Sequence, residues 1–411
     1  MIQSTACGKS MWKEYMKLSA NSSSNLAFAL LLAFLFLINF SIAGCYIFLT
    51  LILLLFILHL ARGGEFPLPP FFCYFFAAYI FFTLLATVFS FDRAASISDN
   101  KELLIFLLIP IYLWLLNTWK RVWLSIWTIL ASGVLSALVG IYTVWHKGIV
   151  LSDRLKGFTS HWMTYAGLLM FAFIFFFVIM FLGKNKKQSL LISGALAVML
   201  IAIVFSLTRS AWLGIAGALL MFLIFFRPKY FLALAPLALI LALLAPLAVK
   251  NRILSIVDLH DKSNLDRIHM VHSGLKIFQD HPWTGVGSNN IEKVIASNEK
   301  RYRHPLAEKI NPHLHNNFLQ ILAERGIFAL ASFLMACLFI ILQLLKLLKA
   351  RTGDWRAITA AVFFAFIGFL IAGMFEYNFG DSEIKFILFY FISLPFLNLK
   401  EEAHVQIKEN R

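Results

Sequence analysis

Long runs of apolar residues, roughly 16 to 24 residues each and separated by short polar stretches, constrain this chain more than any other feature. A helix needs about 20 apolar residues to cross a hydrocarbon layer about 30 Å thick. The 411 residues are 60% hydrophobic and only 14% charged, whereas soluble domains are about a quarter charged. The sequence therefore predicts an all-α polytopic membrane protein and excludes an ordinary soluble enzyme.

About twelve transmembrane helices are predicted from these runs. Two pairs of runs are read as hairpins, one turning near Ala43 and Gly44 and one with Arg209 at its apex. An even number of spans places both ends of the chain on one side of the membrane. The predicted spans are 26–43, 45–61, 71–90, 103–117, 123–145, 163–183, 189–207, 211–226, 231–249, 326–346, 358–375 and 384–399.

The distribution of basic residues predicts the orientation. Lys and Arg outnumber Asp and Glu by 36 to 21, and short cytoplasmic loops of membrane proteins are enriched in Lys and Arg. Eighteen of the 36 fall in the two tails and the loops on their side, against seven in short loops on the other side. Both termini are therefore predicted to be cytoplasmic. Because this excess serves topology, no nucleic-acid partner is predicted.

Five regions follow from this topology. They are a cytoplasmic N-terminal tail (1–25), spans one to nine (26–249), a long periplasmic loop (250–325), spans ten to twelve (326–399) and a cytoplasmic C-terminal tail (400–411). The four cysteines lie in the N-terminal tail or in apolar runs, so neither a disulfide framework nor a cysteine zinc site is predicted.

The long loop resembles soluble protein and carries seven of the eleven histidines. Asn264 stands at the expected N-cap of a first helix in this loop. That helix is predicted to be amphipathic by apolar residues at spacings of three and four, namely Leu265, Ile268, Val271, Leu275 and Phe278. Residues 315–325 predict a second short helix that leads into the tenth span at Gly326, and the run HPWTGVGSNN between the two helices predicts a turn.

Two arginines stand where an anion could bind. Arg209, in SLTRSAWLG (206–214), lies at the outer end of a hairpin. It suits either a residue that snorkels to the membrane surface or a guanidinium that grips phosphate oxygens. Arg267 is predicted in the first turn of its helix, where backbone N–H groups also attract anions. A solvated helix start beside Asp266 is the alternative there.

Two histidines, His313 and His315, precede a predicted helix in NPHLHNNFLQILAERGI (311–327). In an extended segment both would point the same way, which would suit a metal, but no carboxylate cluster or cysteine accompanies them. A histidine in this place suits a general base near the membrane surface, and a merely polar role is the alternative. No metal site and no cofactor are predicted.

Few ionisable residues lie within the predicted spans, and Glu376 and Asp381 belong to the outer end of the eleventh. An ion-coupled transporter usually carries acidic groups near the membrane midplane. The sequence therefore favours chemistry or recognition at the outer membrane–water boundary.

These stretches together resemble the bacterial O-antigen ligases, which share a superfamily with O-antigen polymerases and O-linked protein oligosaccharyltransferases. The resemblance runs from about residue 150 to 385. It rests on RLKGFTSHWMTYAG (154–167), LTRSAWLG (207–214), DRIHMVHSGLKIFQDHPWTGVG (266–287), HLHNNFLQILAERG (313–326) and FEYNFGDSE (375–383). His304, in a basic RYRH run, has no counterpart in this pattern.

The resemblance implies an inverting, metal-independent glycosyltransferase of the bacterial inner membrane. It implies transfer of a polysaccharide from undecaprenyl diphosphate to a sugar hydroxyl of lipid A–core at the periplasmic face, without a nucleotide. Arg209 and Arg267 match the family's diphosphate-binding arginines, and His315 matches its catalytic histidine. Arg154, Glu376 and His313 are possible supporting residues.

Two other functions stay open at this point. An O-antigen polymerase would use the same donor but a second lipid-linked glycan as acceptor. A polyprenyl-lipid flippase or exporter would bind the same lipid without forming a glycosidic bond.

Overall fold

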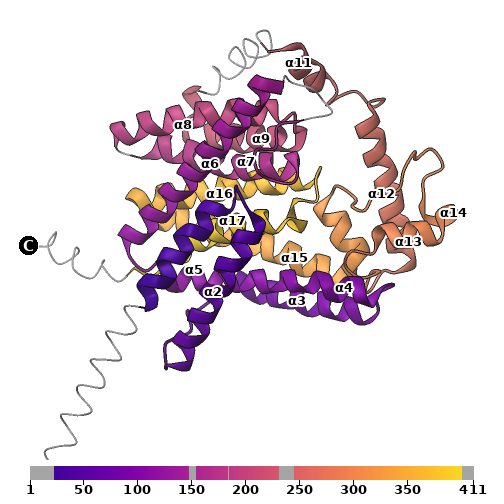
Figure 1. Ribbon diagram of the computed structural model, residues 1–411, viewed down its shortest axis with the longest axis horizontal. Helices are drawn as coiled ribbons and strands as arrows, with labels where there is room; N and C mark the ends of the chain where they lie inside the picture. Colours follow the sequence, from indigo (N-terminus) through magenta and orange to yellow (C-terminus); the bar gives the residue numbers. More distant parts are fainter. Residues whose placement is uncertain (1–22, 148–153, 184, 231–244, 400–411) are drawn as a thin grey trace, which may run out of the picture.

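The computed structural model describes residues 23–147, 154–183, 185–230 and 245–399, and these fold into helices and loops without a strand (Figure 1). Two shorter apolar helices, Ser23–Leu37 and α3 (Phe72–Val88), accompany the long ones. The described part of the chain is all-helical, and the protein is a polytopic membrane protein, as predicted. Among the described residues, the helices long and apolar enough to cross a membrane are α2 (Ile42–Ala61), α6 (Trp119–Lys147), α7 (Trp162–Leu182), α8 (Lys186–Phe205), α9 (Arg209–Phe226), α15 (Asn317–Ala350) and α16 (Gly353–Gly373).

Helices α7 and α16 form the centre of the bundle. In each of them 78% of the apolar window is buried, more than in any other described spanning helix. They pack against each other, α8 packs on α7, and α9 packs on α16. Aromatic side chains fill the joint with α17 (Ser382–Ser393), where the rings of Phe175 and Phe391 stack with centroids 4.5 Å apart. Close packing of this kind holds helices together where lipid offers no hydrophobic driving force.

Two of the predicted spans are not single long α-helices. Residues 103–117 fall in a 3₁₀ helix, Asn100–Leu107, followed by α5 (Leu108–Leu115). Pro110 lacks the N–H that an α-helix would pair with a carbonyl four residues earlier, so an α-helical ladder cannot run through it. Residues 384–399 divide into α17 and a 3₁₀ turn, Leu394–Phe396, which contains Pro395.

The two predicted hairpins have different outcomes. The turn expected near Ala43 and Gly44 was wrong: the chain turns before Ser41, whose hydroxyl caps α2 by accepting a hydrogen bond from the Gly44 N–H at 3.1 Å. The turn between α8 and α9 is confirmed, with Thr208 directly before α9. Most of the ninth predicted span, most of the predicted N-terminal tail and all of the predicted C-terminal tail lie outside the described residues.

The segment after α9 forms a small unit on one side of the bundle (Figure 1). Its helices are α11 (Leu247–Leu254), α12 (Lys262–Asp280), α13 (Ile291–Ser297) and α14 (Glu299–Tyr302). Helices α12, α13 and α14 surround a separate apolar core that includes Met270, Ile277 and Leu314.

Three details predicted for α12 were wrong. The helix begins at Lys262 with Asp261 as its N-cap, three residues before the predicted cap Asn264, and Arg267 therefore lies in the second turn. The predicted apolar stripe is largely exposed, with Ile268 50% and Leu275 45% accessible. The buried face is instead the one bearing Met270 and Ile277, which packs on the start of α15.

A break at Gly326 divides α15, as predicted. Gly326 has φ 77° and ψ −178°, a conformation open almost only to glycine. The turn 282–287 docks there: the Ile327 N–H donates to the Pro282 carbonyl at 3.0 Å, and the Gly287 N–H donates to the Glu324 carbonyl at 2.8 Å. This docking holds the loop unit against the bundle.

We predict that Gly326→Ala destabilises the protein by about 1–3 kcal/mol or more, because the new Cβ is strained at this φ and would collide with the Trp283 carbonyl. The unfolding temperature of the detergent-purified protein measures this. Gly194→Ala, in α8 with open space around its Cβ, is the matched control and should not lower that temperature. Equal unfolding temperatures for the two variants would contradict the account.

Candidate active site

His315 and Glu376 form a hydrogen-bonded pair although they are far apart in the sequence. His315 Nδ1 lies 2.8 Å from Glu376 Oε1, and the two side chains are 25% and 13% exposed. A neutral imidazole that donates from Nδ1 to this carboxylate keeps the lone pair on Nε2. The pair therefore leaves one ring nitrogen able to take a proton.

Two asparagines that the sequence reasoning missed position this pair. The Asn316 side chain accepts from the Leu319 N–H to cap α15 and donates to the Met374 carbonyl at 2.9 Å. Asn317 donates to the Asn378 side chain at 2.7 Å. Both bonds tie the start of α15 to the loop that carries Glu376. His315 itself has φ +47°, a conformation that costs a non-glycine residue energy and is often kept at functional sites.

Arg209 and Arg267 meet at one serine. Arg209 Nη2 donates to Ser263 Oγ at 3.0 Å, and Arg267 Nη1 donates to the same oxygen at 2.9 Å. Arg209 also donates through Nη1 to the Ser255 carbonyl at 2.5 Å and to Asp261 Oδ1 at 3.2 Å. Two arginines from α9 and α12 thus point into one place, and Asp261 is the carboxylate beside them.

Two more guanidinium groups join them. Arg154 lies over the Trp162 ring, with its guanidinium carbon 5.1 Å from the ring centroid. Burial lowers the pKa of Arg154, and the charges of Arg209 and Arg267 lower it further. Burial, followed by the charges of Arg209 and Arg154, lowers the pKa of Arg252 to about 10. Four guanidinium groups gathered in one place give the cluster a strong positive field, which suits an anion.

Arg252 is the arginine that sequence reasoning missed. It belongs to α11, and its Nε donates to the Leu207 carbonyl at 3.1 Å, two residues before Arg209. Leu207 has φ +52°, so this bond holds a strained turn. The only available signal was a basic residue close to the outer end of a predicted span.

The arginine cluster adjoins the His315–Glu376 pair. Arg267 Nε donates to the Phe375 carbonyl at 3.2 Å, next to Glu376. Burial lowers the pKa of Arg267, and the nearby Glu376 charge partly opposes that effect. The structure therefore brings all of the sequence-predicted residues into one region.

A cavity of about 480 Å³ opens beside the pair. The polar walls of this cavity are formed in part by His161, His313, His315, Glu376 and Asp381, and none of the four arginines lines it. Burial raises the pKa of the Asp381 carboxyl to about 7, although the Thr164 hydroxyl donates to that carboxyl at 2.8 Å.

The other two histidines of the cavity are held neutral. Burial lowers the pKa of His313, and the neighbouring His315 adds to the effect. Burial also lowers the pKa of His161. His304, which had no counterpart in the family pattern, stacks on His269 with centroids 4.3 Å apart and lies within the loop unit.

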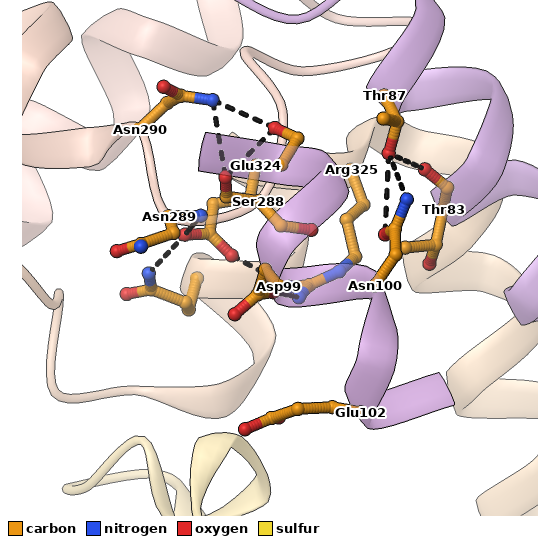
Figure 2. Close-up of polar contacts among 12 residues, drawn as sticks. Thr83, Thr87, Asp99, Asn100, Glu102, Ser288, Asn289, Asn290, Glu324 and Arg325 are labelled. Carbon is orange, nitrogen blue, oxygen red and sulfur yellow. Dashed lines mark hydrogen bonds and ion pairs between the residues drawn. The ribbon is translucent and has the colours of Figure 1, made fainter. Parts of the chain in front are cut away.

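The far wall of the cavity is lined by carboxylates that sequence reasoning missed. Asp99 and Glu102 face the cavity with Glu324, while their counter-ions lie behind the wall. Asp99 lies 3.4 Å from Arg325, and Glu324 accepts from the Asn289 N–H at 2.8 Å (Figure 2). Lys385 forms a short ion pair with Glu102. The cavity wall thus offers carboxylate oxygens whose charge is partly balanced by Arg325 and Lys385.

Across the described residues, no group of three or more His, Cys, Asp or Glu side chains lies close enough together to hold a metal ion. His313 and His315 share the cavity wall. Their nearby partners are Glu376 for His315 and the Tyr377 ring for His313, at 5.6 Å between centroids.

These features define a polytopic membrane protein with a basic cluster and a histidine–carboxylate pair at one site. The O-antigen ligase family model matches residues 194–334, which include Arg209, Arg252, Arg267 and His315. That part of the chain is similar to the O-antigen ligase domain, which agrees with the resemblance found in the sequence.

A curated relative gives the same indication. A protein of Rickettsia conorii, provisionally named a polysaccharide ligase, is 29% identical over 210 residues, which is 49% of this chain and 49% of that protein. The chain therefore matches about half the length of this relative.

The raised pKa of Asp381 predicts a pH-dependent stability. In the unfolded chain an aspartate loses its proton near pH 4, whereas Asp381 in the folded chain keeps it until about pH 7. Stability should therefore fall as pH rises from about 4 to about 7 and stay reduced above that range. Asp381→Asn behaves as a permanently protonated side chain, so it should stabilise the protein by a few kcal/mol at pH 8 and much less at pH 5.

Unfolding temperatures at both pH values measure this difference. Asp258→Asn, at a carboxylate that is 54% exposed, is the control and should show no such dependence on pH. A gain for Asp381→Asn that is the same at pH 5 and pH 8 would contradict the assignment.

Proposed function

We propose that the protein is an O-antigen ligase. It transfers a polysaccharide from undecaprenyl diphosphate to a sugar hydroxyl of lipid A–core, as part of lipopolysaccharide biosynthesis. The observation that carries the proposal is the meeting of Arg209 and Arg267 at Ser263, beside the hydrogen-bonded pair of His315 and Glu376.

The proposed topology has twelve spans in a bacterial inner membrane. Both tails, 1–25 and 400–411, are cytoplasmic, spans one to nine occupy 26–249, and spans ten to twelve occupy 326–399. The segment 250–325 is periplasmic and, with the ends of α9 and α16, forms the active site. The described part of this segment has a small apolar core of its own, separate from the core of the bundle, and this supports its assignment as a distinct periplasmic region.

His315 acts as the general base in this proposal. Its Nε2 takes the proton of the acceptor hydroxyl as that oxygen attacks the anomeric carbon of the donor sugar. Glu376 holds the ring through Nδ1 and stabilises the imidazolium that forms. A positioned general base typically contributes about 10²–10⁴-fold in rate.

The arginine cluster stabilises the leaving group. As the bond between the anomeric carbon and the phosphate oxygen breaks, its electron pair goes to the diphosphate, and negative charge grows there. Guanidinium groups already held in place stabilise such charge without reorganising during the reaction. Arg267 suits direct contact because its Nη2 makes no hydrogen bond with the described residues, whereas both terminal nitrogens of Arg209 are engaged.

The cavity suits the acceptor. Carboxylates such as Asp99 and Glu102 accept hydrogen bonds from sugar hydroxyl groups and repel a diphosphate. The donor phosphates are therefore directed to the arginines and the acceptor sugar to the cavity, with His315 between them. As the family resemblance implies, the reaction inverts the anomeric configuration and needs no metal, cofactor or nucleotide.

An O-antigen polymerase is the second candidate, because the same family model and the same donor chemistry support it. The lipopolysaccharide of a deletion strain distinguishes the two enzymes. Loss of a ligase leaves unsubstituted core, whereas loss of a polymerase leaves core that carries a single repeat unit.

We predict that the deletion strain accumulates unsubstituted core. His315→Ala should fail to restore substitution of the core, because loss of the general base should reduce the rate of transfer at least about 100-fold. Gel analysis of lipopolysaccharide, with membrane levels of each variant checked, measures this. His260→Ala, at a side chain that is 97% exposed, is the control and should restore transfer fully. Normal transfer by His315→Ala would remove this residue from its proposed role.

We also predict different losses for Ala and Lys at Arg267. Arg267→Ala should abolish transfer, while Arg267→Lys should restore it only in part, because lysine keeps the charge but loses the bidentate fork. Initial rates of transfer in membranes measure both. Lys300→Gln, at an exposed basic residue of α14, is the control for a general charge effect. Full activity of Arg267→Ala would exclude a role in diphosphate binding.

A further inference from the structure

A second cavity, of about 980 Å³, lies at the other end of the bundle from His315. Helix α9 joins the two places, since it begins at Arg209 in the arginine cluster and ends at Phe226 in the cavity wall. Its 18 residues extend about 27 Å at 1.5 Å per residue, close to the thickness of the hydrocarbon layer. This cavity therefore faces the opposite leaflet from the proposed active site.

The cavity exists because two helices pack on a third without closing on each other. Helices α9 and α15 each pack against α16, and among the described residues they have little contact with one another. The crevice between them is walled by large apolar side chains, including Phe226, Phe363 and Phe364. Phe225, at its edge, is 71% exposed.

Basic groups surround the polar end of the crevice. Arg227, Lys349 and Arg356 line it, with Asp354 as the one acidic residue among the lining residues. Arg227 is held at the rim, where its guanidinium donates to the Phe181 carbonyl at 3.0 Å and to the Phe226 carbonyl at 3.2 Å. The side chains of Lys349 and Arg356 are exposed and make no hydrogen bond or ion pair with the residues that the structure describes.

The start of α16 adds to this positive field. The helix begins at Gly353, on the cavity wall, and the Thr352 side chain does not cap it. The first-turn N–H groups of a helix carry partial positive charge and favour an anion. The same end of the crevice therefore combines unpaired cations with a helix N-terminus.

The depth of the crevice matches one leaflet. From Gly353 at the rim to Phe364 in the wall, α16 rises about 16 Å at 1.5 Å per residue, which is about half of a hydrocarbon layer about 30 Å thick. An amphiphile with an anionic head at the rim and an acyl chain along the phenylalanines would be complementary to both parts.

We propose that this cavity binds an anionic phospholipid from the leaflet opposite the active site. The net positive rim selects the charged head, and the apolar wall receives an acyl chain. Basic pockets between membrane helices are known to bind lipid headgroups in this way. The proposal is independent of the proposed glycosyl transfer, because no residue of that site takes part.

The test is lipid binding by the full-length purified protein in detergent, titrated with phosphatidylglycerol and, separately, with phosphatidylcholine and followed by native mass spectrometry. The wild type should bind phosphatidylglycerol more tightly than phosphatidylcholine. The double variant Lys349→Gln/Arg356→Gln should lose about 25-fold in phosphatidylglycerol affinity, at about fivefold for each basic residue near an anionic headgroup. Its phosphatidylcholine affinity should not change.

A matched control is Lys300→Gln/Lys309→Gln, which removes the same charge from exposed positions of the loop unit and should bind as the wild type does. The variant Lys349→Arg/Arg356→Lys, which keeps both charges, should retain phosphatidylglycerol binding and so excludes a folding defect as the cause. Equal binding of the two lipids by the wild type, or unchanged phosphatidylglycerol binding by the double Gln variant, would overturn the proposal.

A rival occupant is the chain's own acidic pair, Glu401 and Glu402, which lies outside the described residues. Removal of residues 401–411 should leave phosphatidylglycerol affinity unchanged. A clear gain in affinity would identify the tail as the occupant and overturn the lipid proposal.

Discussion

The hydrogen bond between His315 Nδ1 and Glu376 is the interaction on which the rest of the site depends. It joins residues 61 positions apart and can form only if the start of α15 lies against the loop after α16. Three features bring these segments together: the cap formed by Asn316, the bond from Asn317 to Asn378, and the helix break at Gly326. The packing of the bundle thus determines which imidazole nitrogen is available to a substrate.

Charge separation gives the site its direction. Four guanidinium groups, with Asp261 as the carboxylate beside them, lie near the histidine but do not line its cavity. The cavity is lined instead by the carboxylates Asp99, Glu102 and Glu324, which pair with Arg325 and Lys385. Like charges held together in a partly buried place oppose folding, and such conflicts with local rules are expected at functional sites. A diphosphate would relieve the repulsion among the arginines. A sugar would use the carboxylates as hydrogen-bond acceptors, so the two substrates of a glycosyl transfer have distinct places.

The sequence predicted what depends on local pattern and missed what depends on packing. Apolar run length identified most spanning helices, and motif resemblance identified Arg209, Arg267 and His315. Pattern alone could not show that Pro110 divides one predicted span into two kinds of helix, or which face of α12 is buried. The exposed stripe of α12 is more apolar than its buried face, because the buried face includes His269, Ser273 and Gly274. Arg252 and Asp99 belong to the site only through tertiary contacts, which no spacing in the sequence reveals.

The central claim is that these groups together form a glycosidic bond. Its most direct test is a single reaction with purified protein in proteoliposomes, polyprenyl-diphosphate-linked glycan as donor and lipid A–core as acceptor. The account predicts glycosylated lipid A–core with release of polyprenyl diphosphate, in the presence of a chelator and without nucleotide. Donor binding by correctly folded protein with no product from this acceptor would contradict it.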